Sequence, residues 1–195
     1  MEYKNKRRLI LGFYALLFVL LYIIKNYSFL IRASGVIFGL AVFYFIDHAF
    51  LLKFKFRHYL YILAILILGI LLSPFYWMFE NYDKALHLIM PILGSAIIFF
   101  IVNKMKIKFQ WKLIITLAVI ISCLTLLEIG EYTFDAFLDF KLQGVYIRNI
   151  SGLEKYNLVM DRNDDTMMDL ILGTLGSISF LLMKISAFIY KKFKK

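Results

Sequence analysis

Six side chains of metal-ligand or acid–base type occur at helical spacings in this chain: Asp83 with His87, Glu128 with Glu131, and Asp165 with Asp169. The members of each pair are three or four residues apart, so each pair shares one face of a helix. The surrounding sequence is 62% hydrophobic, and charged groups at membrane depth mark a functional site by default because hydrocarbon solvates them poorly. We expect the six side chains to meet at one edge of a membrane.

This set of side chains is rich in oxygen and contains one imidazole. Carboxylate oxygens favour magnesium, manganese or calcium, and a single histidine also allows manganese or iron. The sequence therefore predicts one or two divalent ions bound by Asp83, His87, Glu128, Asp165 and Asp169. His87 is also a candidate general acid–base, and Glu131 is a candidate base or a support for a ligand.

Two of the pairs also have a plainer interpretation. Asp83 and His87 alone would be typical of a helix start with an interfacial histidine. A helix end that reaches the lipid headgroups explains Asp135 and Asp139, which follow Glu128 along the chain. It explains Glu128 poorly, because a long apolar run precedes that residue and an ionised carboxylate there needs a partner.

The third pair belongs to an acidic run that opens the final apolar stretch. Asp164 or Asp165 can cap a helix there. A cap does not explain Asp161, Asp165 and Asp169, which repeat every fourth residue on one face. Like charges at that spacing repel, so we expect a cation to relieve the repulsion.

Six apolar runs must position these side chains: 9–24, 33–52, 59–76, 85–102, 113–132 and 167–190. Most are near the roughly 20 residues with which a helix crosses a bilayer. We predict an all-α integral membrane protein, a bundle of six transmembrane helices in a single domain over residues 1–195, with an outward loop over 140–163. The basic N-terminus resembles a signal peptide, but no small-residue cleavage site follows, so we expect a retained first helix.

The distribution of charge predicts the orientation. With six spans, 15 of the 23 Lys and Arg residues fall on the side of both termini, and 11 of the 13 Asp and Glu residues fall on the other. Basic loops stay in the cytoplasm, so cytoplasmic termini and a site facing outward from the plasma membrane are predicted. The net charge of +10 is then a topology signal with attraction to anionic lipid, and nucleic-acid binding is not expected.

The other polar and small residues are expected to serve structure. Asp47 and His48 lie too far along the membrane normal to join the acidic site, so interfacial snorkelling or a local hydrogen bond explains them. His58 is expected to be solvated among basic residues. Glycine pairs predict close contacts between helices: Gly35 with Gly39, and Gly173 with Gly176.

The order of the acidic residues resembles that of the YjdF-like family of small multi-pass membrane proteins. The resemblance covers residues 82–183 and rests on Asp83-x-x-x-His87, Glu128-x-x-Glu131, Asp165-Thr166-x-x-Asp169 and the glycines Gly173 and Gly176. That family has Gly-Asp shortly before Asp-Thr, where this chain has Asn163-Asp164. More distantly, the order is similar to VanZ-like proteins, which carry an Arg ahead of the last Asp, a place that Arg162 would fill. The resemblance implies a site and no particular reaction.

We predict a membrane-embedded metal-dependent enzyme, a hydrolase or a transferase, that acts on a lipid or lipid-linked headgroup. The substrate would arrive from the outer leaflet, and Arg148 and Arg162 of the 140–163 loop would bind its anionic group. Two alternatives remain open. One is a proton- or cation-coupled transporter or sensor, with polar groups continuing toward Asp47 and His48; the other is a non-catalytic protein with a structural cation. The substrate and the oligomeric state are also open.

Overall fold

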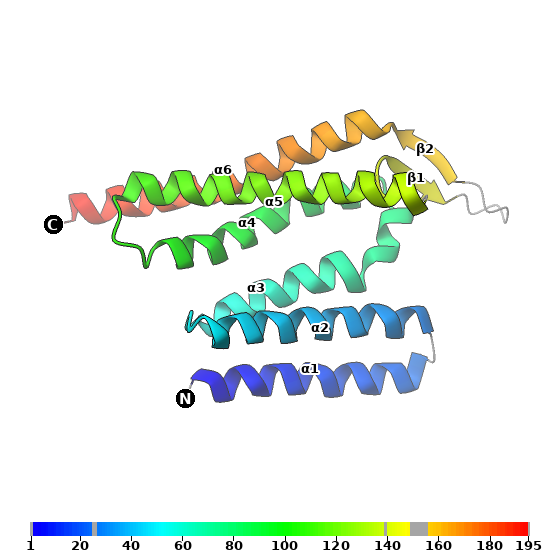
Figure 1. Ribbon diagram of the computed structural model, residues 1–195, viewed down its shortest axis with the longest axis horizontal. Coiled ribbons are helices and arrows are strands. Elements are labelled where there is room, and N and C mark those ends of the chain that lie inside the picture. The colour runs from blue at the N-terminus through cyan, green and yellow to red at the C-terminus, as the bar shows by residue number, and fades with distance from the viewer. Residues whose placement is uncertain (1, 25–26, 139, 149–155, 195) are drawn as a thin grey trace. The chain divides into compact units, whose positions relative to one another are not determined.

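The computed structural model describes residues 2–24, 27–138, 140–148 and 156–194, and the chain divides into two compact units, residues 1–73 and 74–195. Figure 1 shows that almost all of the described elements are helices. Four of these helices are long and apolar enough to cross a membrane: α2 (Tyr27–Ala49), α4 (Tyr82–Val102), α5 (Phe109–Leu138) and α6 (Arg162–Phe193). The expectation of a helical membrane protein agrees with this architecture.

The first unit contains α1 (Glu2–Ile24), α2 and α3 (Phe56–Leu66), which a π-helical turn, η1 (Ile67–Leu71), continues. The α3–η1 segment packs on α2 where two glycines leave room. A Cβ at Gly39 would lie 2.6 Å from Leu66 Cδ2, and one at Gly35 would lie 3.2 Å from Ile70 Cγ2. The predicted glycine contact is confirmed. As a helix, Phe56–Leu71 is shorter than the four long ones.

A buried ion pair anchors the helices of the first unit. Asp47 on α2 is fully buried and accepts hydrogen bonds from Lys6 Nζ at 2.6 Å, Tyr59 OH at 2.7 Å and the Phe54 N–H at 3.1 Å. Local hydrogen bonding is therefore the explanation that holds for Asp47. His58 is buried too, and the prediction that it is solvated is wrong, because its Nδ1 accepts a backbone N–H at the start of α3 at 3.0 Å.

The second unit is a bundle of α4, α5 and α6, preceded by a short turn, η2 (Ser73–Trp77). Between α5 and α6 the chain forms an antiparallel hairpin of β1 (Val145–Arg148) and β2 (Tyr156–Met160), in which Val145 pairs with Met160 and Arg148 with Tyr156. Trp77 packs on Tyr156 with ring centroids 5.1 Å apart. The hairpin lies at one end of the bundle and the C-terminal end of α6 at the other (Figure 1).

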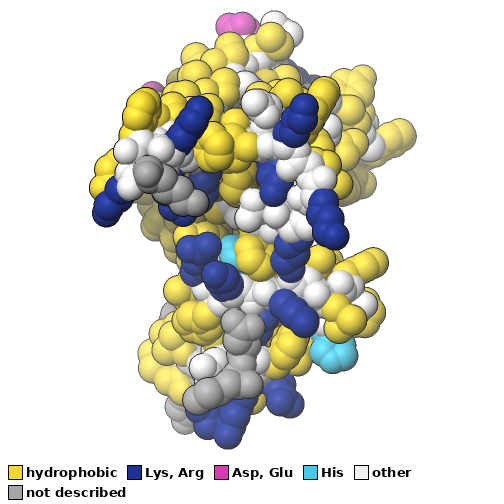
Figure 2. Space-filling model, turned by 90° about the vertical axis from the view of Figure 1, so that its left-hand side faces the viewer, with side chains coloured by type: hydrophobic (Ala, Val, Ile, Leu, Met, Phe, Trp, Pro, Cys, Tyr) yellow, Lys and Arg dark blue, Asp and Glu magenta, His cyan; other side chains and the backbone are white. Residues whose placement is uncertain are grey.

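The two ends of the second unit differ in charge. The described carboxylates of this unit lie at the hairpin end, where α4 and α6 begin and α5 ends, and we name it the acidic end. The opposite, basic end carries a set of lysines: Lys104, Lys106, Lys108, Lys112, Lys184, Lys191, Lys192 and Lys194. In the upper part of Figure 2, which looks onto the basic end, dark blue side chains lie among yellow hydrophobic ones. The charge pattern of the sequence is thus kept in the bundle.

Candidate metal and acid–base site

Three helices bring carboxylates around His87, which lies near the start of α4. His87 Nε2 is 3.6 Å from Asp83 Oδ1, and its Nδ1 is 3.6 Å from Asp169 Oδ1 on α6 and 3.9 Å from Glu128 Oε1 on α5. The His87, Glu128 and Asp169 side chains are all buried. One ligand atom each from Asp83, His87 and Asp169 falls within 4.8 Å of the others, close enough for a single metal ion to contact all three.

Small residues on α6 permit this close approach. A Cβ at Gly176 would lie 2.2 Å from the Leu88 carbonyl oxygen of α4, and a Cβ at Gly173 would lie 2.5 Å from Leu124 Cδ1 of α5. A larger residue at Gly176 would require the backbone of α4 to move, and one at Gly173 would require at least the Leu124 side chain to shift. The predicted close packing at these two glycines is confirmed, and it sets the depth at which α6 presents its acidic residues.

Lys84, a residue that the helical spacing does not single out, is the basic member of the cluster. Its Nζ donates to Asp169 Oδ1 at 2.8 Å and Oδ2 at 2.9 Å, to Asp165 Oδ1, and to Asp83 Oδ2 at 3.3 Å. The repulsion expected between Asp165 and Asp169 is therefore relieved by a side chain of the protein itself. The sequence does carry one signal: Lys84 directly follows Asp83, at the start of the apolar run that contains His87.

Asp165 also fixes the loop that follows α5. Its Oδ2 accepts the Gly144 N–H at 2.7 Å. Gly144 has a φ of +91°, which disfavours any side chain, and a Cβ there would also lie 3.2 Å from the Met160 carbonyl oxygen. Beside it, Gln143 Nε2 donates to Thr166 Oγ1 at 3.2 Å. The loop is thus held against the first turns of α6.

Asp135 holds the same loop from α5. Its two carboxylate oxygens accept the Leu142 N–H at 2.8 Å and the Gln143 N–H at 3.0 Å, and the side chain is buried. The interpretation of Asp135 as an acid that reaches the headgroups is therefore wrong, because backbone donors in this partly buried loop need an acceptor. Asp139, interpreted in the same way, lies outside the described residues.

Glu128 is the least satisfied carboxylate of the cluster. It is 5% exposed, and neither of its oxygens has a hydrogen bond within the described part of the chain; the same is true of His87 Nδ1. The Thr166 hydroxyl lies near Glu128, but the two groups do not form a hydrogen bond of ordinary geometry. Glu131, further along α5, is half-buried and within electrostatic range of Glu128. Buried carboxylates in this condition need a proton or a cation.

The start of α6 uses a different acid from the one expected. Asp161 is the N-cap, and its Oδ1 accepts the N–H groups of Asn163 and Asp164, both at 3.0 Å. The prediction that Asp164 or Asp165 caps the helix is wrong, because Asp164 is exposed in the first turn and Asp165 is directed to Lys84. Asp161 is exposed, so the expected stripe of three acids contributes its last two members to the cluster.

The two arginines expected to bind a headgroup lie on the exposed surface. Arg148 ends β1 and pairs with Tyr156, at the end of the hairpin away from Gly144. Arg162 is the first residue of α6. Residues 149–155, between the strands, lie outside the described residues. The role of both arginines toward a substrate stays a prediction.

The assembled cluster has a surplus of negative charge. One ammonium group, Lys84, lies among five carboxylic acids: Asp83, Glu128, Glu131, Asp165 and Asp169. Protons or a metal cation must balance the remainder, and carboxylate oxygens with one imidazole are donors that hard divalent ions accept. An imidazole beside unpaired carboxylates can also exchange protons.

Comparison with known proteins gives one match. Residues 6–190 match the model of a family described as "Predicted membrane protein (DUF2238)". No curated protein and no solved structure matches the chain. The match covers most of the chain and supports the expected relationship to a family of membrane proteins, while the resemblance to YjdF-like and VanZ-like proteins stays a prediction.

Proposed function

The chain belongs to the DUF2238 family of predicted membrane proteins, and we propose that it is a membrane enzyme that binds a divalent metal ion with Asp83, His87 and Asp169. The enzyme would hydrolyse or transfer a phosphate or ester group of a lipid or lipid-linked substrate. One observation carries the proposal: a ligand atom from each of these three residues lies within 4.8 Å of the others. Magnesium, manganese, iron or calcium would suit this donor set.

The surroundings of the three ligands support this assignment. Glu128 Oε1 lies 3.9 Å from His87 Nδ1 and has no hydrogen bond, so Glu128 would be the fourth ligand, with a carboxylate oxygen as its donor atom. Asp165 was also predicted as a ligand, and it lies outside this group of three. Its two oxygens are occupied by Lys84 and by the Gly144 N–H, so Asp165 would hold Lys84 and the loop in place.

The neighbouring side chains supply the remaining chemistry. The bound metal would polarise a phosphoryl or ester oxygen or activate a water molecule. Glu131 is half-buried beside the ligands and would accept a proton as the general base. Lys84 would offset negative charge on an anionic headgroup. His87 would serve as a ligand, or exchange a proton where the metal leaves its imidazole free.

We propose that this chemistry takes place at the outer face of the plasma membrane. The six spans would be α1, α2, α3 with η1, α4, α5 and α6, with both termini in the cytoplasm. The lysines at the basic end of the second unit and the carboxylates at its acidic end support this orientation. A headgroup would reach the cluster from the outer leaflet, where Arg148 and Arg162 would bind its anionic part.

The main alternative is a proton- or cation-coupled transporter or sensor. The unpaired Glu128 favours it, because buried acids can carry protons. Deeper along the α4–α6 interface, the Ser95 and Ser177 hydroxyls lie 2.9 Å apart and bond to each other. On α4 no ionisable side chain lies between Ser95 and Val102, and on α6 none lies between Ser177 and Lys184. This apolar stretch favours a site closed on its inner side, as an enzyme requires.

Metal content would test the proposal. The full chain would be purified in mild detergent without chelator, supplied with manganese or magnesium, separated from free ions and examined by elemental analysis. Asp169→Asn and His87→Ala would be compared with Asp164→Asn. The control makes the same chemical change as Asp169→Asn, on the same helix, at an exposed position.

We expect about one ion per chain in the wild type and in Asp164→Asn, and loss of the ion in the other two variants. If the wild type retains no ion after divalent metals are added back, the metal-dependent enzyme is excluded and the proton-coupled alternative takes its place. If metal is bound, turnover of radiolabelled membrane lipids by wild type and Asp169→Asn would then identify the reaction.

A further inference from the structure

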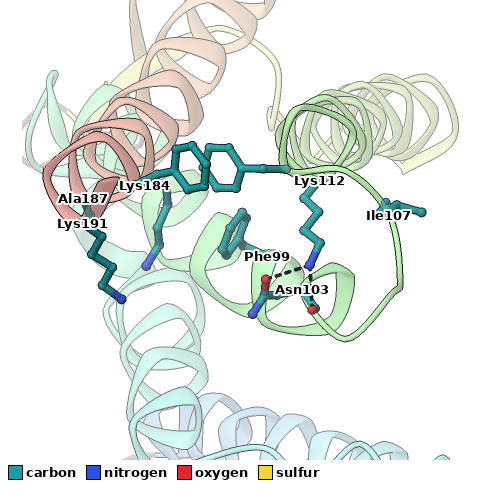
Figure 3. A pocket seen from close by; sticks show the side chains of 9 residues that line it. Phe99, Asn103, Ile107, Lys112, Lys184, Ala187 and Lys191 are labelled. Atoms are coloured by element: carbon teal, nitrogen blue, oxygen red, sulfur yellow. Dashed lines mark hydrogen bonds between the residues drawn. The ribbon is translucent and has the colours of Figure 1, made fainter. Parts of the chain in front are cut away.

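A cavity of about 520 Å3 opens at the basic end of the second unit, opposite the carboxylate cluster. All three helices of the bundle contribute to its walls. Figure 3 shows Lys184 and Lys191 extending from α6 and Lys112 from α5, on either side of Phe99 of α4 and Asn103, the residue that follows α4. Three ammonium groups therefore lie around one hollow, which we name the basic pocket.

No Asp or Glu is among the described residues that line the basic pocket. Every described Asp and Glu of the second unit lies in the half of the bundle near the acidic end. Lys112 Nζ donates to the Asn103 carbonyl oxygen at 2.9 Å and to its Oδ1 at 3.1 Å, so it is held in place by neutral groups. Lys184 Nζ lies 4.9 Å from the centre of the Phe180 ring and 5.5 Å from that of Phe99. The residues that line the pocket therefore carry a net positive charge.

Aromatic rings form the apolar walls of the same pocket. Phe109 of α5 and Phe188 of α6 are stacked, with centroids 4.3 Å apart and planes 9° from parallel. Phe99 lies 6.4 Å from Phe109 and 6.0 Å from Phe180. A ligand that combines an anionic group with hydrocarbon would match this lining, since lysines and phenylalanines line the same space.

We infer that the basic pocket binds the phosphate group of an anionic phospholipid, with the acyl chains running along the phenylalanine walls. Basic pockets between transmembrane helices are suited to such headgroups. The orientation of the protein in the membrane is enough to explain exposed lysines near the end of α6, such as Lys191. It does not explain Lys184, which lies two turns earlier in α6 and is half-buried. Free phosphate carries the same anionic group, and the experiment separates the two sources. The inference does not depend on the proposed metal site.

Native mass spectrometry of the purified full chain would test it. The protein would be delipidated in detergent and titrated with phosphatidylglycerol, with phosphatidylcholine and with inorganic phosphate. The double variant Lys112→Gln/Lys184→Gln would be compared with Lys106→Gln/Lys192→Gln. The control pair removes the same charge from the same end at exposed positions that do not line the pocket.

We expect saturable phosphatidylglycerol binding that weakens roughly tenfold or more in the pocket variant, since each lysine near a lipid surface contributes on the order of 1 kcal/mol. Binding should change less than about threefold in the control, and phosphatidylcholine should not compete. Competition by millimolar phosphate would assign the pocket to a free anion and overturn the lipid assignment. Equal losses in both variants, or no saturable binding by a wild type of native helical content, would exclude the pocket altogether.

Discussion

Lys84 of α4 donates to both carboxylate oxygens of Asp169 on α6, at 2.8 and 2.9 Å. The same ammonium group binds Asp165, one turn earlier on α6. One lysine therefore bridges two acids that would otherwise repel each other at helical spacing. Lys84 also helps to position the candidate ligands around His87, because Asp169, the partner of Lys84, is itself a candidate metal ligand.

Replacing Lys84 with Gln should destabilise the protein, because it leaves two buried carboxylates without their cation. Loss of one partner from a buried ion pair costs about 3 to 5 kcal/mol. We expect a lower melting temperature in detergent, measured by differential scanning fluorimetry, and a larger gain in melting temperature on adding manganese than in the wild type. Lys108→Gln, an exposed change at the basic end, should show neither effect. Equal stability of Lys84→Gln and wild type would contradict the ion-pair assignment.

Replacing Gly176 with Ala should separate α6 from α4. The new Cβ would lie 2.2 Å from the Leu88 carbonyl oxygen, which is backbone and cannot rotate away. Overpacking of this kind costs roughly 1 to 3 kcal/mol, and the shift should also reduce metal binding by moving Asp169 from His87.

Gly130→Ala is the matched control for this change. A Cβ there meets no atom within 4 Å, and alanine favours a helix over glycine by about 1 kcal/mol. Its melting temperature should therefore stay the same or rise. If Gly176→Ala behaves like Gly130→Ala, the close contact between α4 and α6 is refuted.

Replacing Asp135 with Ala should release the loop between α5 and β1. The Leu142 and Gln143 N–H groups would lose their acceptor, so their amide hydrogen exchange should accelerate. Asp161→Ala is the comparison, since it removes the α6 cap at an exposed position and costs about 1 kcal/mol. It should accelerate exchange at Asn163 and Asp164 and leave residues 142 and 143 unchanged. Unaltered exchange at 142 and 143 in Asp135→Ala would show that Asp135 does not hold the loop.

Replacing Asp47 with Asn should destabilise the first unit. Lys6 Nζ lies 2.6 Å from Asp47, and both side chains are at most 1% exposed, so the variant buries an uncompensated ammonium group at a cost of about 3 to 5 kcal/mol. On heating, proteolytic cleavage within residues 1–73 should begin at a lower temperature in Asp47→Asn than in the wild type. His48→Gln changes the exposed neighbour on the same helix and should leave the cleavage temperature as in the wild type.

Sequence periodicity was sufficient to predict which residues share a helix face, but it did not predict every contact partner of those residues. The glycine contacts at positions 39, 173 and 176 follow from spacing and are found, as is the meeting of Asp83, His87 and Asp169. Asp135 and Asp161 were misinterpreted because both bind backbone N–H groups that local turns expose. Such turns depend on where the chain re-enters the bundle, which helical periodicity does not encode. The β1–β2 hairpin within the expected loop likewise has no helical signal.

The sequence by itself determined that this protein is a helical membrane protein with an acidic face on three helices, because hydrophobic run length and the helical repeat are local properties. The tertiary structure alone decided that Lys84 occupies the space between Asp165 and Asp169, and that Glu128 is left without a hydrogen bond. These pairings depend on the rotation and depth of each helix relative to its neighbours. Contacts such as that of Gly176 with Leu88 set both, over separations of more than eighty residues.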